Sequence, residues 1–177
     1  MDIREALLEL VNSESVRYSY MAIEKIIIVM MRDYLKAQNK RLLAENEVMH
    51  RISDMILPDG IDNEDGCIAA EIKLYRHKQM SLRLIYDTIG RFSINRGEIN
   101  KLLLMVVNEL PEGIRNRIEE KKKQLNFELT IWDIDDLIRI FSNNENLFVE
   151  TYNNLNTVLL RDTINDGILR NNSTYLE

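Results

Sequence analysis

The stretch Cys67–Tyr75 carries the residues best suited to chemistry in this sequence. Its apolar composition predicts a buried strand, in which alternate side chains face opposite sides of a sheet. Glu71 and Lys73 then share one face, with two alanines before Glu71 leaving space above it. Burying these charges is costly unless they are paired or bind a metal. The alternative is an ion pair on the solvated face of an edge strand, worth about 0–1 kcal/mol.

A second acid lies on a long helix predicted at roughly residues 17–38. Apolar residues recur there at helical spacing and form one stripe, and Glu24 falls in the middle of it. An acid on a buried helix face is uncommon without a partner. Glu24 therefore either pairs with a structural arginine or joins Glu71 around a cation or its bound water.

A third carboxylate is expected on the strand before Glu71, and two residues compete for the role. Asp59 lies in Pro58-Asp59-Gly60, which is also a turn signature. If the hairpin closes there, Asp59 sits at the turn, several residues away from Glu71. Asp54 is followed by the strand-like Met-Ile-Leu and falls nearly opposite Ala70 and Glu71 in that register, so we favour Asp54. A shifted pairing would favour Asp59.

The elements around these residues predict an α/β fold. Two strands at roughly 50–57 and 67–75 form a hairpin, followed by a helix at 78–92, a strand at 102–107, a helix at 111–125, a strand at 127–132 and a helix to 141. This order implies a central mixed sheet of four to five strands flanked by helices, with right-handed crossovers. A helical interaction domain without this sheet is the alternative architecture. Residues 39–47 are polar and loop-like.

Composition bounds the function without choosing it. The chain has 177 residues, a net charge of -6 and one cysteine. The acidic balance argues against coating nucleic acid through bulk charge but is compatible with a carboxylate-rich active site. The longest apolar run is far too short to span a bilayer, and no signal-peptide pattern opens the chain. We therefore expect a cytoplasmic protein with no membrane partner and no internal disulfide.

Taken in order, these motifs resemble the PD-(D/E)XK nuclease superfamily. Asp54-Met-Ile-Leu-Pro-Asp-Gly, a polar loop and Ile68-Ala-Ala-Glu71-Ile-Lys73 look like its nuclease hairpin. The preceding helix with Glu24 resembles the Mrr-like and related restriction-endonuclease-like branch, as does the segment 127–137. The likeness covers roughly residues 17–142. One departure is that this branch often carries glutamine where Glu71 stands.

The resemblance implies a DNA endonuclease that depends on Mg²⁺ or Mn²⁺. Asp54 and Glu71 would hold the metal, Glu24 would orient a water bound to it, and Lys73 would help to position and deprotonate the attacking water. Arginine and lysine side chains after the motif (Arg76, Lys78 and Arg83, with His77) are weaker candidates for binding phosphates. The rival function is an inactive nuclease-like fold that binds nucleic acid or scaffolds an assembly.

The resemblance also implies a wider setting. Residues 1–143 would form the restriction-endonuclease-like nuclease domain of a bacterial restriction or antiphage defence protein. Residues 144–177 have helical spacing and would form an extension that leads to a regulatory or ATPase domain or subunit. Cutting both DNA strands with one active site per chain favours a homo-oligomer.

Overall fold

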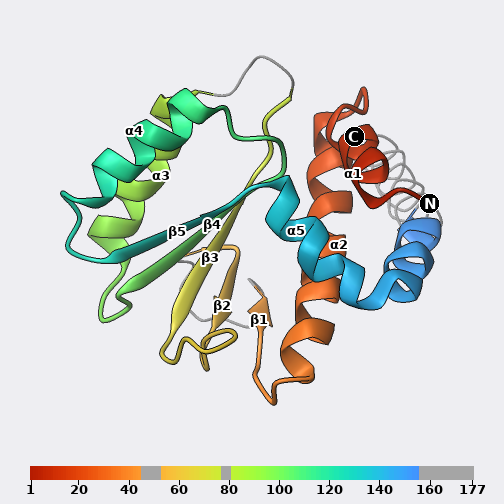
Figure 1. Cartoon of the computed structure of the whole chain (residues 1–177), viewed down its shortest axis with the longest axis horizontal. Helices are drawn as coiled ribbons and strands as arrows, with labels where there is room; N and C mark the ends of the chain where they lie inside the picture. The colour runs from red at the N-terminus through yellow and green to blue at the C-terminus, as the bar shows by residue number, and fades with distance from the viewer. Residues whose placement is uncertain (45–52, 77–80, 156–177) are drawn as a thin grey trace, which may run out of the picture.

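The computed structural model describes residues 1–44, 53–76 and 81–155 (Figure 1). The helices are α1 (Ile3–Val11), α2 (Val16–Lys36), α3 (Leu82–Asn95), α4 (Glu112–Lys122), α5 (Ile134–Phe141), the short 3₁₀ helix η3 (Ser142–Asn144) and a helix at residues 145–155. The strands are β1 (Leu43–Ala44), β2 (Met55–Leu57), β3 (Ile68–Lys73), β4 (Lys101–Val106) and β5 (Glu128–Trp132). Residues 50–52 of the predicted hairpin and residues 78–80 of the predicted helix lie outside the described ranges.

The five strands form one mixed sheet in the order β1-β2-β3-β4-β5. The first three strands pair antiparallel, whereas β3, β4 and β5 run parallel through the crossover helices α3 and α4. The predicted α/β class and mixed sheet are therefore confirmed, and the helical alternative is wrong. The prediction of a loop at 39–47 missed β1, which spans only Leu43–Ala44 and is too short for an alternating pattern.

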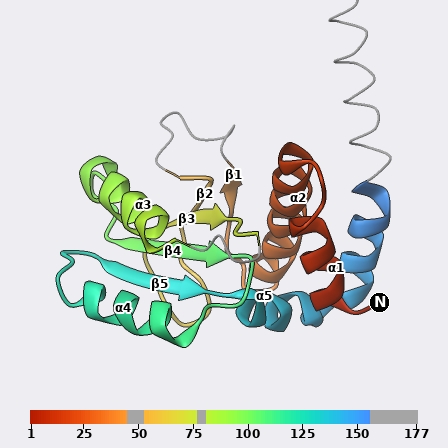
Figure 2. The same cartoon turned by 90° about the horizontal axis from the view of Figure 1, so that it is seen from above.

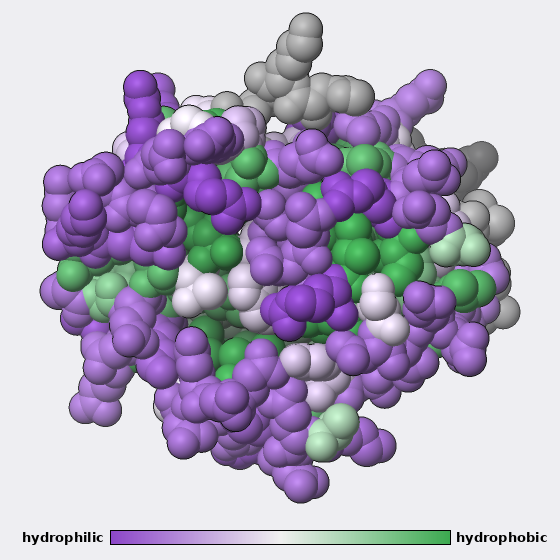
Figure 3. Space-filling view, in the orientation of Figure 1, coloured by the Kyte–Doolittle hydropathy of each residue, from purple (hydrophilic) through white to green (hydrophobic). Residues whose placement is uncertain are grey.

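Helices cover both faces of the sheet. Figure 2 shows α3 and α4 on one side and α1, α2 and α5 on the other. Ala70 and Ile72 of β3 pack in the core that includes α2, whereas Ala69 packs against the buried face of α3. The strands are thus covered on both faces, which explains the unbroken apolar run of β4. The face seen in Figure 1 is mostly hydrophilic, with hydrophobic side chains showing mainly in recessed strips (Figure 3).

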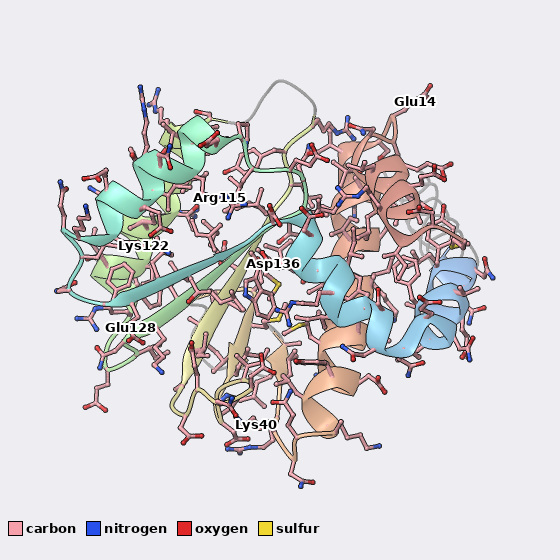
Figure 4. All side chains as sticks on the ribbon, viewed as in Figure 1. Glu14, Lys40, Arg115, Lys122, Glu128 and Asp136 are labelled. Carbon is pink, nitrogen blue, oxygen red and sulfur yellow. The ribbon has the colours of Figure 1, made fainter. Side chains whose placement is uncertain are left out.

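The start of α5 links two of these helices. Asp133 caps α5 through a capping box completed by Asp136. The Arg115 guanidinium of α4 donates to Asp133 Oδ2 at 2.7 Å. Arg115 and Asp136 accordingly lie close to the junction of α4, β5 and α5 in Figure 4. This ion pair holds α4 to the end of β5.

The C-terminal end of α2 and the residues just after it form hydrogen bonds with the β2–β3 hairpin. The Tyr34 hydroxyl and the Gln38 amide both donate to Asp62 Oδ1, and the Asp62 backbone N–H donates to Gln38 Oε1 at 2.8 Å. Asp62 has a positive φ of 53°, a conformation that aspartate tolerates in turns. The hairpin turn is therefore bound to the same helix that carries Tyr20 and Glu24.

The helix at residues 145–155 packs into the main core. Phe148 is fully buried, and its ring stacks on Phe141 with 5.9 Å between the centroids. Leu155 at the end of this helix is also buried. The first part of the predicted extension thus contributes to the core, and residues 156–177 lie outside the described part of the chain. No helix among the described residues is both long and apolar enough to cross a membrane.

Gly90 makes α3 weaker than it needs to be for folding alone. It lies in the interior of α3, where a glycine destabilises a helix by about 0.5–1 kcal/mol relative to alanine. An added Cβ would meet no heavy atom within 4 Å. Gly90→Ala is therefore expected to raise the free energy of unfolding by about 0.5–1 kcal/mol. Urea denaturation of the two proteins would check this, and a loss of stability would show a contact absent from this structure.

Candidate active site

Asp54 lies at the entrance to β2, directly opposite the chemistry-bearing segment of β3. Met55 pairs with Ala70, which brings Asp54 level with Glu71, as the sequence register predicts. The Asp54 side chain is almost completely buried, with 3% of the residue exposed. Its Oδ1 accepts a hydrogen bond from the Tyr20 hydroxyl at 2.9 Å, and its Oδ2 accepts one from the Ile72 backbone N–H at 2.7 Å. Both oxygens are thus held in fixed positions.

Glu71 and Lys73 lie next to this carboxylate on the same stretch of β3. The Lys73 Nζ is 3.3 Å from Glu71 Oε1, and their side chains are 24% and 18% exposed. Because β3 is the middle strand of five, the alternative of a solvated edge-strand ion pair is wrong. Burial raises the pKa of Glu71, and the nearby Asp54 raises it further, while Lys73 acts in the opposite direction. The site therefore concentrates negative charge that Lys73 only partly balances.

This raised pKa has a consequence for stability. The ordinary pKa of glutamate, which applies to the unfolded chain, is near 4.5. Because the pKa of Glu71 is higher in the folded state, ionising Glu71 as the pH rises above 4.5 costs more in the folded state than in the unfolded chain and lowers the free energy of unfolding. The loss of stability is complete above the raised pKa and absent well below 4.5. Glu71→Gln is therefore expected to unfold at higher denaturant concentration than the wild type at pH 8 without metal, and this difference should disappear towards pH 4. Chemical denaturation at both pH values measures it, and an unchanged difference would contradict the assigned cause.

Asp59 lies at the hairpin turn and has a partner of its own. Its carboxylate accepts hydrogen bonds from the Arg41 backbone N–H at 3.0 Å and from the Arg41 guanidinium at 2.9 and 2.8 Å. These contacts lower the pKa of Asp59 to about 2. Of the two aspartates that competed on sequence grounds, the structure brings Asp54 to Glu71 and places Asp59 with Arg41 instead.

Tyr20 joins the site from α2 and was not among the residues that sequence analysis singled out. Burial raises the pKa of Tyr20 well above its ordinary range, and the charges of Asp54, Glu24 and Glu71 add to this rise. Of the predicted carboxylates, Asp54 contacts this hydroxyl directly, and Glu24 and Glu71 act on it through their charge. Glu24, which is half-buried, lies one helical turn after Tyr20 on α2. This spacing of four residues was the signal available in the sequence.

The arrangement suits a hard divalent cation bound by few protein ligands. Within residues 1–44, 53–76 and 81–155, no group of three or more histidine, cysteine, aspartate or glutamate side chains is placed to hold an ion. Mg²⁺, however, keeps several waters and is usually bound through one or two carboxylates. Asp54 and Glu71 supply one buried and one partly buried carboxylate whose mutual repulsion a cation would relieve, so these residues fit Mg²⁺ or Mn²⁺. Among the described residues, Glu24 does not join Asp54 and Glu71 in a group of three carboxylates placed to hold an ion.

The basic residues that follow the Glu71–Lys73 motif lie in different surroundings. The Arg76 guanidinium donates to the Ser13 carbonyl and to Ser19 Oγ, which ties β3 to the loop between α1 and α2. Arg83 is exposed on α3. His77 and Lys78 lie outside the described residues. Comparison with known proteins adds no further assignment, since no protein-family model and no curated protein matches this chain.

Proposed function

We propose that this chain is a metal-dependent nuclease that hydrolyses phosphodiester bonds in DNA. One observation carries the proposal: the buried carboxylate of Asp54 and the partly buried carboxylate of Glu71 lie beside a lysine that is itself only partly exposed. Burying charges in such a cluster costs folding free energy, and a bound ligand can offset this cost. Metal-assisted phosphoryl transfer needs this combination of oxygen ligands and a cation.

The position of the cluster in the sheet supports the same function. Lys73 ends β3, and the parallel strands β4 and β5 end at the same edge. Ligands of open parallel sheets bind outside the carboxyl ends of the strands. Asp54 lies near this edge because β2 runs antiparallel to β3 and Met55 pairs with Ala70, which places Asp54 level with Glu71, two residues before the end of β3. Side chains from both faces, including Tyr20 of α2, can therefore meet there.

In this mechanism each residue has a distinct task. Asp54 and Glu71 would hold the cation, which when bound stabilises negative charge on the phosphate and acidifies water. Lys73 would donate to a phosphate oxygen and stabilise the charge that builds up in the transition state. Glu24 would accept a hydrogen bond from the attacking water and orient it. Cleavage that leaves a 5′-phosphate is what the resemblance to PD-(D/E)XK nucleases implies.

The wider setting belongs to the same proposal. A restriction-endonuclease-like core with DNA as substrate, a cytoplasmic location and a role in bacterial restriction or antiphage defence rest on the family resemblance. A homo-oligomer is supported by the need for two active sites to cut two strands. A regulatory or ATPase partner at the C-terminal helix rests on the helical spacing of residues 144–177.

The direct test is cleavage of supercoiled plasmid and linear DNA by the purified chain. Nicking in Mg²⁺ or Mn²⁺ that EDTA abolishes is the expected result, and Lys73→Ala should remove it. Undiminished cleavage by this variant would mean that the activity comes from another site or a contaminant. Calorimetric titration with Mn²⁺ adds a second readout, because the rival of an inactive nuclease-like fold predicts no binding of metal at Asp54 and Glu71.

Tyr20→Phe tests how Asp54 is held. Removing the hydroxyl that orients a metal-binding carboxylate typically lowers metal affinity or activity by about 10–100-fold. We expect the Mg²⁺ concentration for half-maximal cleavage to rise about tenfold, with little loss of rate at saturating Mg²⁺. Tyr152→Phe is the matched control, since it also removes a tyrosine–carboxylate contact, to Glu9 at 3.4 Å. Equal behaviour of the two variants would deny Tyr20 a positioning role.

A further inference from the structure

An open groove of about 590 Å³ lies beside Lys73, between the end of β3 and helix α3. Lys73 and Tyr75 line one wall, and Thr88, Gly90 and Arg91 line the other. Since the candidate catalytic lysine forms part of its wall, whatever occupies the groove adjoins the site of cleavage. The groove is thus placed to hold the part of a substrate next to the reacting phosphate.

Gly90 lies on the α3 wall of this groove and, having no side chain, leaves the groove open there. The residue is exposed in the middle of a helix, and neither a positive φ nor a close neighbour requires a glycine there. Folding alone would be better served by almost any other residue except proline. A side chain at position 90 would instead project from the groove wall. Access to the groove therefore explains a residue that packing does not explain.

The polar groups of the groove suit a chain of phosphates. Lys73 and Arg91 supply positive charge, and Asp87 is the acid among the lining residues. Arg91 is exposed, and its guanidinium donates a long hydrogen bond of 3.5 Å to Thr88 Oγ1. Leu84, half exposed at the rim, offers an apolar surface. Arginine and lysine contacts to phosphates fix nucleic acids in register, and apolar side chains can contact the sugars between them.

We propose that this groove binds the sugar-phosphate backbone of the DNA strand that is cut, on the side of the scissile phosphate that faces α3. The inference rests on the proposed nuclease function and names where its substrate lies. Arg91 binds a phosphate of the flanking nucleotides, Lys73 binds the scissile phosphate, and Gly90 leaves room for the strand to pass between them.

Two pairs of matched variants test the groove. Arg91→Gln removes a positive charge from the groove, and the control Arg117→Gln removes a positive charge from the exposed face of α4. Gly90→Gln fills the groove, and Gly113→Gln adds the same side chain to α4, where a Cβ also meets nothing within 4 Å. Because glutamine favours helix more than glycine does, both glycine variants should melt at a temperature no lower than the wild type. Lost binding in Gly90→Gln would then not reflect misfolding.

Binding is measured by the fluorescence anisotropy of a labelled DNA duplex in EDTA over a range of salt concentrations. Arg91→Gln should weaken binding several-fold and reduce the slope of log K against log salt by about 1, and Gly90→Gln should weaken binding about tenfold or more. The α4 variants should bind like the wild type. Unchanged binding by both groove variants would overturn the proposal.

The outcomes for the groove and for the nuclease separate cleanly. If the wild type cuts plasmid and Gly90→Gln cuts and binds equally well, the groove proposal fails and the nuclease stands. If the groove variants lose binding but no protein cuts DNA in Mg²⁺ or Mn²⁺, the groove stands as a nucleic-acid site and the nuclease fails. If the wild type neither binds nor cuts DNA, both proposals fail.

Discussion

Lys73→Ala is expected to lower the rate of plasmid nicking in saturating Mg²⁺ by about 10²–10⁴-fold, the range found for positioned groups that stabilise charge or transfer protons in a transition state. The reason lies in its surroundings. Lys73 is only 24% exposed, and it is the positive group paired with Glu71. In such a partly desolvated position a charge acts on a phosphate more strongly than it would in water. Single-turnover cleavage measures the chemical step.

Glu71→Gln is the companion variant for this experiment. It should also lose cleavage, because a neutral amide binds Mg²⁺ more weakly than a carboxylate, yet it should be more stable than the wild type at pH 8. A variant that loses activity while it gains stability cannot have failed through unfolding. Cleavage by Glu71→Gln at the wild-type rate would remove this residue from the site.

Asp54→Asn is expected to have the second large effect, a loss of about a thousandfold in cleavage, whereas Asp59→Asn should cleave like the wild type. Loss of a carboxylate that binds the metal forfeits several kcal/mol of charge stabilisation, and each 1.36 kcal/mol corresponds to a tenfold change in rate. Asp54 is buried beside Glu71, but Asp59 is committed to Arg41 at the turn. Parallel assays of the two variants compare the same chemical change at both positions.

The reverse result would reassign the metal-binding aspartate. If Asp59→Asn lost activity and Asp54→Asn retained it, the hairpin would have to pair in a shifted register during catalysis. Mn²⁺ titration of both variants supports the comparison, since only the variant that lacks a metal ligand should bind the ion more weakly. Wild-type affinity in Asp54→Asn would exclude it as a ligand.

The sequence predicted the middle of the sheet well, for physical reasons. A charged pair within an apolar run is rare because burial is costly, so Glu71 and Lys73 stood out without any structure. The placement of Asp54 followed from the turn chemistry of Pro58-Asp59-Gly60, which located the end of the hairpin. Periodicity and the register of alternate side chains were enough for these positions.

Other parts of the fold depend on contacts that sequence patterns do not encode. Tyr20 reads as one more member of an apolar stripe, because the feature that distinguishes it is the distance from its hydroxyl to Asp54. The two-residue strand β1 exists only through its pairing with β2. The sequence of α3 gives no reason for the glycine at position 90, and only the groove beside it in the structure suggests one. Each of these features arises where segments distant in the sequence meet.

The hydrogen bonds between α2 and the β2–β3 hairpin make the candidate site preorganised. One helix of 21 residues contacts Asp54 through Tyr20 near its first turns and Asp62 through Tyr34 near its last. At about 1.5 Å per residue, a helix of this length is a rigid strut some 30 Å long. The strand that carries Asp54 and the turn that follows it are therefore braced against the same body. A ligand that enters the site meets carboxylates already in place, so little of its binding free energy is spent on ordering them.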